Sequence, residues 1–461
     1  MPGSSDPEGY WVPAFAGTTL SERATVMEFK LLPGGTINGE ARVPGDKSMS
    51  HRSMMLGALA EGTTRVTGFL EGEDALATQS AFRAMGVDIE RVAEGEVLVH
   101  GVGLHGLRPP AQALDLGNAG TGMRLMCGLL AGQPFDTVLT GDASLCARPM
   151  GRVIDPLQLM GAEIASEAGG RPPLRIRGGR ALHGIHYDLP MASAQVKSCV
   201  LLAGLYAEGR TSVTEPGPTR DHTERMLRGF GYEVSNDNGV ISLQGGGKLR
   251  ATDIDVPADI SSAAFFLVAA SITPGSDLLL THVGINPTRI GVLNILKLMG
   301  ADITLKNERE AGGEPVADIR VRYAPLRGID IPEEQVPLAI DEFPALFIAA
   351  ACAEGRTVLR GAQELRVKES DRIVAMAEGL DTLGVPNEVL DDGIIIEGGS
   401  PIGGGEIRTH MDHRIAMAFA IAALRAEREI YVLDCDHVAT SFPGFDALAR
   451  GLGLQISVHG D

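Results

Sequence analysis

The sequence predicts an α/β protein of two similar halves, each built from three repeated units, and two recurring patterns carry this prediction. In the first, a hydrophobic residue, a glycine and a short strand-like run recur six times along the chain of 461 residues. This pattern indicates a helix that ends at a glycine and leads into a strand. The six glycines are Gly86, Gly161, Gly231, Gly300, Gly384 and Gly453, of which the copy around Gly384 (LGVPNE) is the weakest.

The second pattern recurs in phase with the first, and consists of an Ala/Leu-rich helix, a turn and a β-branched strand. Its six copies lie at residues 56–68, 126–141, 201–215, 267–283, 347–361 and 420–434. Together the two patterns predict six units of helix, strand, helix and strand. Because the first helix of each unit is apolar nearly all round, we expect it to be buried on most sides.

These six apolar helices nevertheless begin with polar or charged residues. The residues are Lys47, Ser48 and Arg52; Asn118, Thr121 and Arg124; Ser193, Gln195 and Lys197; Asp259, Ser261 and Ser262; Asp341; and Asp412, His413 and Arg414. Buried helices should not carry charges without partners. We therefore expect three parallel helices per half, with all N-termini facing one cleft between the halves. Six positive helix ends would favour a polyanionic ligand there.

The stretch at 44–60, PGDKSMSHRSMMLGALA, is the clearest candidate for an anion site. It places Lys47, Ser48 and Arg52 at the start of a helix, and Ser48 and Arg52 share one face of it. The unpaired backbone N–H groups of that helix end point in the same direction. Taken alone, the stretch also fits an ordinary capped helix with a solvated lysine and arginine.

Composition restricts the class of protein. The length suits two domains, or one large domain with a deep cleft. A net charge of −19 argues against a nucleic-acid partner and requires any anion site to concentrate its cations locally. The five scattered cysteines indicate a reduced, cytoplasmic protein, and the longest apolar run, 263–272, is too short for a membrane span. Residues 1–26 lack signal-peptide features, and we interpret them as a disordered extension or a misplaced start.

Nine motifs in a fixed order support a resemblance to a known family. They are GDKSMSHR (45–52), LGNAGTGMR (116–124), RPMG (148–151), ASAQVKS (192–198), TRDHTE (219–224), IDEFP (340–344), RVKESDR (366–372), MDHR (411–414) and ATSFP (439–443). Together they resemble 5-enolpyruvylshikimate-3-phosphate synthase, closest to the class that includes naturally glyphosate-tolerant bacterial enzymes. The resemblance runs from about Gly39 to the C-terminus.

The fold implied by the resemblance is a two-domain inside-out α/β barrel, in which each domain has three βαβαββ units with buried parallel helices. The implied domains are 46–257 and 27–45 plus 258–461, with the active site in the cleft between them. The repeat patterns give the same number of units independently of the resemblance.

The implied activity is transfer of the carboxyvinyl group of phosphoenolpyruvate to the 5-hydroxyl of shikimate 3-phosphate, with release of phosphate. This step belongs to the shikimate pathway to chorismate and the aromatic amino acids, and the family uses no metal and no cofactor. A monomer is expected. The residues that resemble shikimate 3-phosphate ligands are Lys47, Ser48, Arg52, Ser193, Ala194, Gln195, Arg220, Asp341 and Lys368. Those that resemble phosphoenolpyruvate ligands are Lys47, Asn118, Gly120, Arg148, Gln195, Arg372 and Arg414.

Three of the resembling residues are candidates for catalysis. Asp341 resembles the acceptor of the 5-hydroxyl proton, Glu369 resembles the residue that handles the proton at the methylene carbon, and Lys47 touches both substrates. Addition needs a base on the hydroxyl and an acid on the alkene carbon, and elimination needs the reverse transfer. Because a carboxylate among cations is usually ionised, a proton-donating Glu369 requires partial burial to raise its pKa.

Several positions bear on the inhibitor glyphosate, which occupies the phosphoenolpyruvate pocket in this family. Thr440 stands where many members have a lysine, and Ala194 where others have a serine; both changes also fit the tolerant class. Gly120 stands where tolerant members have an alanine whose methyl excludes glyphosate, so the sequence predicts inhibition. Cys146 lies near Arg148, and we interpret it as a bystander thiol because no base is apparent beside it.

Two other functions are compared with this one. The sister enolpyruvyl transferase that acts on UDP-N-acetylglucosamine shares the fold, but it has a Lys-Asn pair where Lys47 and Ser48 stand, and a catalytic cysteine loop. A non-enzymatic six-unit scaffold would expose its basic residues on a concave face. The net charge of −19, with cations confined to helix starts, opposes that alternative.

Overall fold

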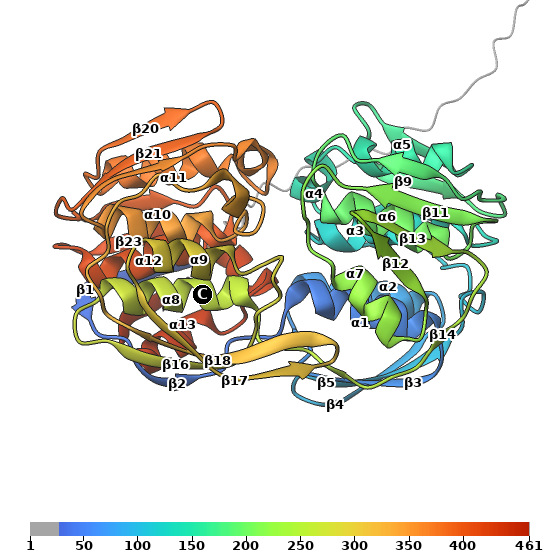
Figure 1. Ribbon diagram of the computed structural model, residues 1–461, viewed down its shortest axis with the longest axis horizontal. Coiled ribbons are helices and arrows are strands. Elements are labelled where there is room, and N and C mark those ends of the chain that lie inside the picture. The colour runs from blue at the N-terminus through green and yellow to red at the C-terminus, as the bar shows by residue number, and fades with distance from the viewer. Residues whose placement is uncertain (1–26, 461) are drawn as a thin grey trace, which may run out of the picture.

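The computed structural model describes residues 27–460 as two bodies side by side, joined at one edge (Figure 1). Each body has its own hydrophobic core. One core is formed by buried residues between Met49 and Val256. The other combines residues from Phe29 to Val43 with residues from Ala258 to Ile456. The interpretation of residues 1–26 as an extension lies outside the described residues.

The first body contains the first three repeated units, each of which alternates helices with strands. The first unit consists of α1 (Lys47–Leu59), β3 (Ala60–Thr67), α2 (Glu73–Ala84), β4 (Asp88–Ala93) and β5 (Glu96–Val102). The second consists of β6 (Leu114–Asp115), α3 (Gly120–Ala131), β7 (Thr137–Thr140), α4 (Ala143–Ala147), α5 (Gly151–Leu159), β8 (Glu163–Glu167) and β9 (Arg171–Arg177). The third consists of β10 (His186–Asp188), α6 (Ala194–Gly204), β11 (Arg210–Thr214), α7 (His222–Gly229), β12 (Val234–Asp237) and β13 (Val240–Gln244), followed by β14 (Leu249–Arg250) and β15 (Ile254–Asp255).

The second body contains the other three units and also takes in the first two strands of the described chain. Its first unit consists of β2 (Asn38–Ala41), α8 (Ile260–Ile272), β16 (Asp277–Gly284), α9 (Gly291–Leu298), β17 (Asp302–Ala311) and β18 (Glu314–Arg322). The next consists of η1 (Glu333–Gln335), α10 (Phe343–Cys352), β19 (Gly355–Leu359), η2 (Gln363–Val367), α11 (Arg372–Thr382), β20 (Asn387–Leu390) and β21 (Gly393–Gly398). The last consists of β22 (Gly405–Arg408), α12 (His413–Ala422), η3 (Ala423–Arg425), β23 (Ile430–Leu433), η4 (Asp436–Thr440), α13 (Phe445–Leu452), β24 (Leu454–His459) and β1 (Glu28–Gly35).

Each unit contributes one small sheet, so residues 27–460 form six sheets. The sheet of the second unit has the order β6-β7-β9-β8, in which β6 and β7 are parallel and the remaining pairs are antiparallel. The last sheet has the matching order β22-β23-β1-β24. The strand β1 therefore takes the place of the final strand of the sixth unit, although it opens the described part of the chain.

The glycines that mark the repeats have the conformation that the sequence predicts. All six have a positive φ, from +76° at Gly384 to +117° at Gly453. This left-handed conformation ends a helix at little steric cost only when the residue is glycine. In each unit the glycine lies one or two residues after the end of the last helix and turns the chain into the next strand.

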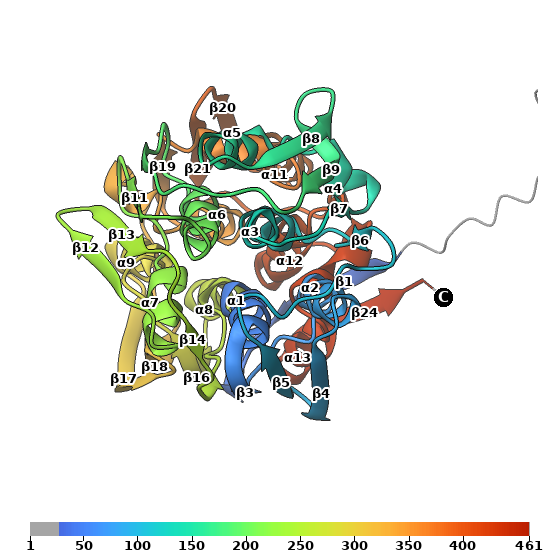
Figure 2. The same ribbon diagram turned by 90° about the vertical axis from the view of Figure 1, so that its right-hand side faces the viewer.

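The first helix of each unit is buried, as its apolar sequence predicts. Every residue of α8 is buried, and so are eleven consecutive residues of α1, from Met49 to Leu59. Figure 2 shows α1, α3 and α6 inside the first body, with strands around them. No helix within residues 27–460 is long and apolar enough to cross a membrane. The expected α/β barrel with its helices inside is confirmed.

The two bodies are joined where the chain crosses twice between them. Asp46 N–H donates to the carbonyl of Pro257 over 2.8 Å, and Asp259 N–H donates to the carbonyl of Pro44 over 2.9 Å. These residues immediately precede α1 and α8, the first buried helix of each body. The crossing therefore fixes where both helices begin.

A second link is made by the hairpin of β17 and β18, which reaches from the second body towards the first (Figure 1). At its tip Glu314 accepts a hydrogen bond of 2.8 Å from Asn286 and lies 2.7 Å from Nδ1 of His222, the first residue of α7. His222 and Glu314 are both buried. The link is thus a buried hydrogen-bonded contact between the two bodies, away from the solvent.

Candidate active site

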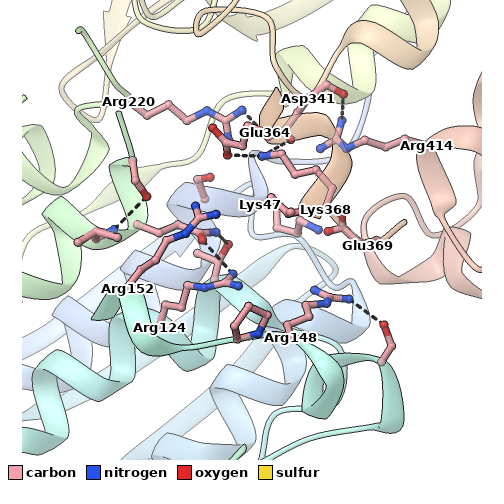
Figure 3. Close-up of a pocket in the computed structure, with 18 of the residues that line it drawn as sticks. Lys47, Arg124, Arg148, Arg152, Arg220, Asp341, Glu364, Lys368, Glu369 and Arg414 are labelled. Carbon is pink, nitrogen blue, oxygen red and sulfur yellow. Dashed lines mark hydrogen bonds and ion pairs between the residues drawn. The ribbon is translucent and has the colours of Figure 1, made fainter. Parts of the chain in front are cut away.

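The starts of all six buried helices line a cavity of about 440 Å³ between the two bodies (Figure 3). From the first body come Lys47 and Ser48 of α1, Thr121 and Arg124 of α3, and Ser193 and Gln195 around the start of α6. From the second come Asp259, which caps α8, Asp341, which lies just before α10, and Arg414 of α12. The arrangement expected from the repeats is therefore present, and six helix N-termini point at one space.

The lining of this cavity is strongly cationic, in contrast to the chain as a whole. Eight cationic side chains stand against four acidic ones, whereas the whole chain has a net charge of −19. The cations are Lys47, Arg124, Arg148, Arg152, Arg220, Arg289, Lys368 and Arg414, and the acids are Asp259, Asp341, Glu364 and Glu369. Together with the helix dipoles, this excess of positive charge suits a ligand with several negative charges.

Lys47 stands at the first position of α1 because Asp46 caps that helix by accepting a hydrogen bond from Met49 N–H. The Lys47 Nζ lies 3.0 Å from a carboxylate oxygen of Asp74. Arg52, one turn further along, lies behind the cavity wall and donates to the Ser48 carbonyl over 2.9 Å. Its buried guanidinium thus supports the start of α1 from behind, and burial lowers its pKa to about 10.

The start of α6 provides hydroxyl and amide groups beside these cations. Ser193 caps the helix, and Ala194 is its first residue. Gln195 donates to Thr121 over 2.9 Å and accepts from Arg124 over 2.9 Å, so its amide is fixed between α3 and α6. Ala194 lines a smaller adjoining cavity that shares Ser193, Gln195, Arg220, Asp341 and Lys368 with the main one.

Asp341 is the centre of the cationic network on the side of the second body. Its carboxylate lies 2.5 Å from Arg220 of the first body, 3.4 Å from Lys368 and 3.2 Å from Arg372. Arg414 donates to its backbone carbonyl over 3.1 Å. Burial alone raises its pKa, but Lys368, Arg220 and Arg414 together hold the pKa of this carboxyl well below its usual range.

Glu369 is ionised in the free protein as well. Burial raises its pKa, but Arg372 at 2.6 Å, with Arg148 and Lys47 further away, brings the pKa well below the usual range. From the sequence we expect that Glu369 needs a raised pKa to donate a proton. In the free protein its pKa is lowered instead, so this requirement is not met before ligands bind. Arg372 itself is fully buried behind Asp341 and Glu369, where Asp412 at 2.8 Å also holds it.

Asn118, Gly120 and Arg148 meet at the start of α3. Arg148 donates to the side-chain oxygen of Asn118 over 2.5 Å. A methyl group added at Gly120 would lie 3.1 Å from a guanidinium nitrogen of Arg124 and 3.1 Å from one of Arg148. The three residues therefore surround one spot, and any side chain at position 120 points at the two arginines.

The structure brings together all the residues that the sequence predicts for the site, although not all line the cavity. Arg52, Asn118, Gly120 and Arg372 lie directly behind the lining residues and contact them. Thr440 is buried and donates to the His437 carbonyl over 2.7 Å, outside the cavity lining.

Arg152, Arg289 and Glu364 line the cavity and were not predicted as site residues. Arg152 adjoins the RPMG motif, which could have revealed it, since the chain reads RPMGR there. Arg289 follows no repeat pattern and reaches the cavity only through the fold. Cys146 also lies near this region, where its thiol donates to the Gly141 carbonyl over 3.3 Å, and no role is assigned to it.

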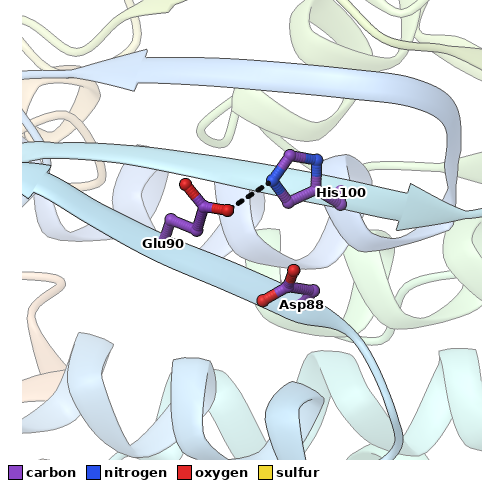
Figure 4. Close-up of side chains that lie close together, drawn as sticks. All are labelled: Asp88, Glu90 and His100. Carbon is purple, nitrogen blue, oxygen red and sulfur yellow. Dashed lines mark ion pairs between the residues drawn. The ribbon is translucent and has the colours of Figure 1, made fainter.

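A separate group of potential metal ligands lies on the outer strands β4 and β5. Figure 4 shows Asp88, Glu90 and His100, whose ligand atoms all lie within 4.8 Å of one another. Both carboxylates are exposed, and the His100 Nε2 lies 3.4 Å from Glu90. Exposed groups of this kind are readily explained by a surface ion pair, and we assign no metal to them.

Two solved structures share the fold of this chain to different degrees. The fold is shared with the enolpyruvyl transferase NikO from Streptomyces tendae, at a TM-score of 0.76 over 95% of this chain and all of that one; the identity of 19% makes this a likeness of fold alone. EPSP synthase from Acinetobacter baumannii is much more similar, with 62% identity, a TM-score of 0.85, and coverage of 94% of this chain and 100% of that chain.

Comparison of sequences identifies the family to which this chain belongs. The profile of the EPSP synthase (3-phosphoshikimate 1-carboxyvinyltransferase) family matches residues 31–448. A 3-phosphoshikimate 1-carboxyvinyltransferase from Alkalilimnicola ehrlichii is 67% identical over 94% of this chain and 97% of its own length. The chain belongs to the EPSP synthase family.

Proposed function

We propose that the cationic cavity is where this chain transfers the carboxyvinyl group of phosphoenolpyruvate to the 5-hydroxyl of shikimate 3-phosphate. Both substrates carry a phosphate and a carboxylate. The observation that carries the proposal is the concentration of eight cations in a cavity that six helix N-termini also line, in a chain of this family with a net charge of −19. Guanidinium forks and helix N-termini are the groups that bind such anions.

In this proposal the first body supplies most of the shikimate 3-phosphate contacts. Ser48, Ser193, Gln195 and Arg220 lie together along the starts of α1 and α6 and in the loop before α7, with Arg52 behind Ser48. Asp341 and Lys368 approach the same space from the second body. The ion pair between Arg220 and Asp341 must open for the substrate, whose phosphate then replaces the Asp341 carboxylate as the partner of Arg220.

Phosphoenolpyruvate occupies the adjoining space between Lys47, Arg148 and Arg414. Gly120 leaves room there because it has no side chain, and Asn118 holds Arg148 in place. Arg372 reaches this ligand only when Glu369 or Asp341 releases its guanidinium. Lys47 lies between the two substrates and contacts both.

The reaction then proceeds in two steps, addition and elimination. Asp341 accepts the proton of the 5-hydroxyl as its oxygen bonds to the second carbon of phosphoenolpyruvate, and Glu369 gives a proton to the methylene carbon. In the second step the bond between carbon and phosphate oxygen breaks, phosphate leaves with the proton that Asp341 had accepted, and Glu369 takes a proton back from the new methyl group. The double bond is thereby restored in the product.

Glu369 gains the ability to donate a proton through substrate binding itself. Its pKa is low in the free protein because Arg372 and other cations surround it. The phosphate and carboxylate of phosphoenolpyruvate neutralise part of this positive charge and add negative charge nearby. Both effects raise the pKa of Glu369 and make its protonated form accessible.

Glyphosate, an anion that resembles phosphoenolpyruvate, binds in the same space and inhibits the enzyme. The protein acts as a monomer: both bodies that line the cavity belong to one chain, so no second copy is needed to bring them together. It works in a reducing compartment, the cytoplasm, in keeping with the five free cysteines.

The test is titration calorimetry with shikimate 3-phosphate, followed by measurement of phosphate release after phosphoenolpyruvate is added. We expect shikimate 3-phosphate to bind alone and phosphate to appear only with both substrates. UDP-N-acetylglucosamine serves as the competing acceptor. Phosphate release with that acceptor, or none with shikimate 3-phosphate, would contradict the proposal. Light scattering on a sizing column measures the molar mass in solution and so checks that the protein is a monomer.

A further inference from the structure

Arg289 is a buried arginine at the junction of the two bodies that the repeats and motifs leave without a role. It lies in the loop between β16 and α9 and is only 3% exposed, yet it forms part of the cavity lining. Its guanidinium pairs with Asp46 of the first body and, at 2.9 Å, with Asp259 of the second. It also donates to the Ser261 hydroxyl over 2.5 Å.

The two carboxylates that Arg289 holds are the caps of the first buried helix in each body. Asp46 accepts from Met49 N–H over 2.8 Å at the start of α1. Asp259 accepts from Ser261 N–H over 2.9 Å at the start of α8, and also from Lys47 N–H over 3.1 Å. One guanidinium therefore joins two helix starts that belong to different bodies, and one of its partners binds the backbone of Lys47.

A third carboxylate extends the contact to the catalytic side of the second body. Glu342 directly precedes α10, accepts a hydrogen bond from Ser261 and lies 3.9 Å from Arg289. It directly follows Asp341. The contacts thus run from Lys47 through Asp259 and Arg289 to Glu342, the residue beside Asp341. Arg289 therefore connects the backbone positions of Lys47 and Asp341, the two residues proposed to act on the same substrates.

The charges show why an arginine is needed at this point. Asp46, Asp259 and Glu342 are all buried within 3.9 Å of Arg289, beside a cavity that receives anions. Burial lowers the pKa of Arg289, but the three carboxylates outweigh this effect and raise it above its ordinary value, so the guanidinium stays charged. Without it, the carboxylates would be buried with less compensation and would repel incoming phosphates.

We propose that Arg289 is a positioning residue that holds Lys47 and Asp341 in register across the junction during the reaction. This inference rests on the proposed function of the cavity. Although Arg289 lines the cavity, its guanidinium is held by Asp46, Asp259 and Ser261, and the role assigned to it acts through these partners. It fixes the helix starts from which the substrate-binding groups project, and a guanidinium does this better than an ammonium because its planar fork serves two carboxylates at once.

Two substitutions and a matched control test the proposal. Arg289→Lys keeps the charge and loses the fork, and we expect kcat to fall about 10-fold, the size of one lost charge-assisted hydrogen bond. Arg289→Gln loses both the charge and the fork, and we expect kcat to fall about 100-fold, as for reacting groups displaced by about 1 Å. The KM for shikimate 3-phosphate should change less than kcat, because no hydrogen bond or ion pair joins Arg289 to Ser193, Gln195 or Arg220, which supply other contacts to that substrate. Leu293→Ala in neighbouring α9 truncates a buried core side chain and serves as the stability control.

Chemical rescue separates positioning from a merely structural role. In Arg289→Ala, millimolar guanidinium chloride should restore part of kcat, whereas sodium chloride at equal ionic strength and urea should not. All assays are run well below the melting temperature of the variant. If wild type releases no phosphate, the proposed function itself fails. If wild type is active, then unchanged kcat in the variants, or losses that match Leu293→Ala with no rescue, would overturn the role of Arg289.

Discussion

Among single residues, Lys47 is expected to matter most for activity, because it stands at a helix start between the two proposed substrate positions. Its ammonium lies 3.0 Å from Asp74, a buried carboxylate, so the free protein already holds it in place. We expect Lys47→Met to lower kcat roughly 100- to 1,000-fold, as the loss of one well-placed donor to a developing negative charge does.

The measurement for Lys47→Met is steady-state phosphate release, with a thermal melt to show that the fold persists. Lys306→Met, at an exposed lysine on β17, is the matched control and should behave as wild type. Turnover close to wild type in Lys47→Met would remove Lys47 from the site. A melting temperature far below that of the control would instead reflect the unpaired Asp74.

Gly120 decides how much room there is beside two arginines. A methyl here would lie 3.1 Å from nitrogens of both Arg124 and Arg148, and the backbone of Gly120 lies outside the left-handed region, so alanine can adopt it. We expect Gly120→Ala to weaken glyphosate about 10- to 200-fold, while phosphoenolpyruvate, which is shorter, loses much less.

Paired inhibition curves against phosphoenolpyruvate check this expectation in wild type and Gly120→Ala. The wild type should be inhibited. Equal inhibition constants in the two proteins, or a wild type insensitive to millimolar glyphosate, would show that another position determines sensitivity. Thr440 and Ala194 would then be the positions to change next.

At the level of elements, the β17–β18 hairpin ties the second body to α7 of the first through His222 and Glu314. Burial raises the pKa of Glu314, but His222 and Arg225 outweigh it and bring the pKa below the ordinary 4.5. A depressed pKa means that the unfolded chain takes up a proton before the folded one does. The stabilisation is therefore complete above pH 4.5 and is lost as pH falls through the lower folded pKa.

We expect Glu314→Gln to destabilise the protein by about 1–3 kcal/mol at neutral pH, as for a buried group left without its charge-assisted partner. The difference from wild type should shrink as pH falls below 4.5. Denaturant melts at several pH values measure both effects. Glu310→Gln, at an exposed position of the same hairpin, is the control. A Glu314→Gln deficit that stays constant through acid pH would contradict this account.

The elements also show what the sequence could and could not reveal. Helices, their burial and the glycines that end them follow from local patterns, because the helical period and left-handed φ are properties of a few adjacent residues. The contact between Arg289 and Asp46 joins positions 243 residues apart, and no local pattern encodes it. The low pKa of Glu369 is only partly local: Arg372 lies three residues along the chain, whereas Arg148 and Lys47 come near only in the folded chain.

For the whole molecule, the division of the cavity between two bodies predicts a movement on binding. Neither body alone supplies all the cations that line the space, so a ligand with several negative charges draws the two together. We expect shikimate 3-phosphate to reduce the radius of gyration in X-ray scattering, and glyphosate to reduce it further. Inorganic phosphate is the control for a non-specific ionic effect. Scattering curves that superpose with and without shikimate 3-phosphate would contradict the movement.

The place of β1 in the last sheet has a consequence for the order in which this chain can assemble on the ribosome. Phe29 pairs with Val432 and with Val458, so the strand made first waits for strands made near the end. The first body has all its core residues once Val256 has been made, and it can fold while synthesis continues. The second body closes only after β23 and β24 have been made, because β1 pairs with both. Until then β1 lacks its partner strands, and the first body, which lies between these segments in the sequence, separates the two segments that must later meet.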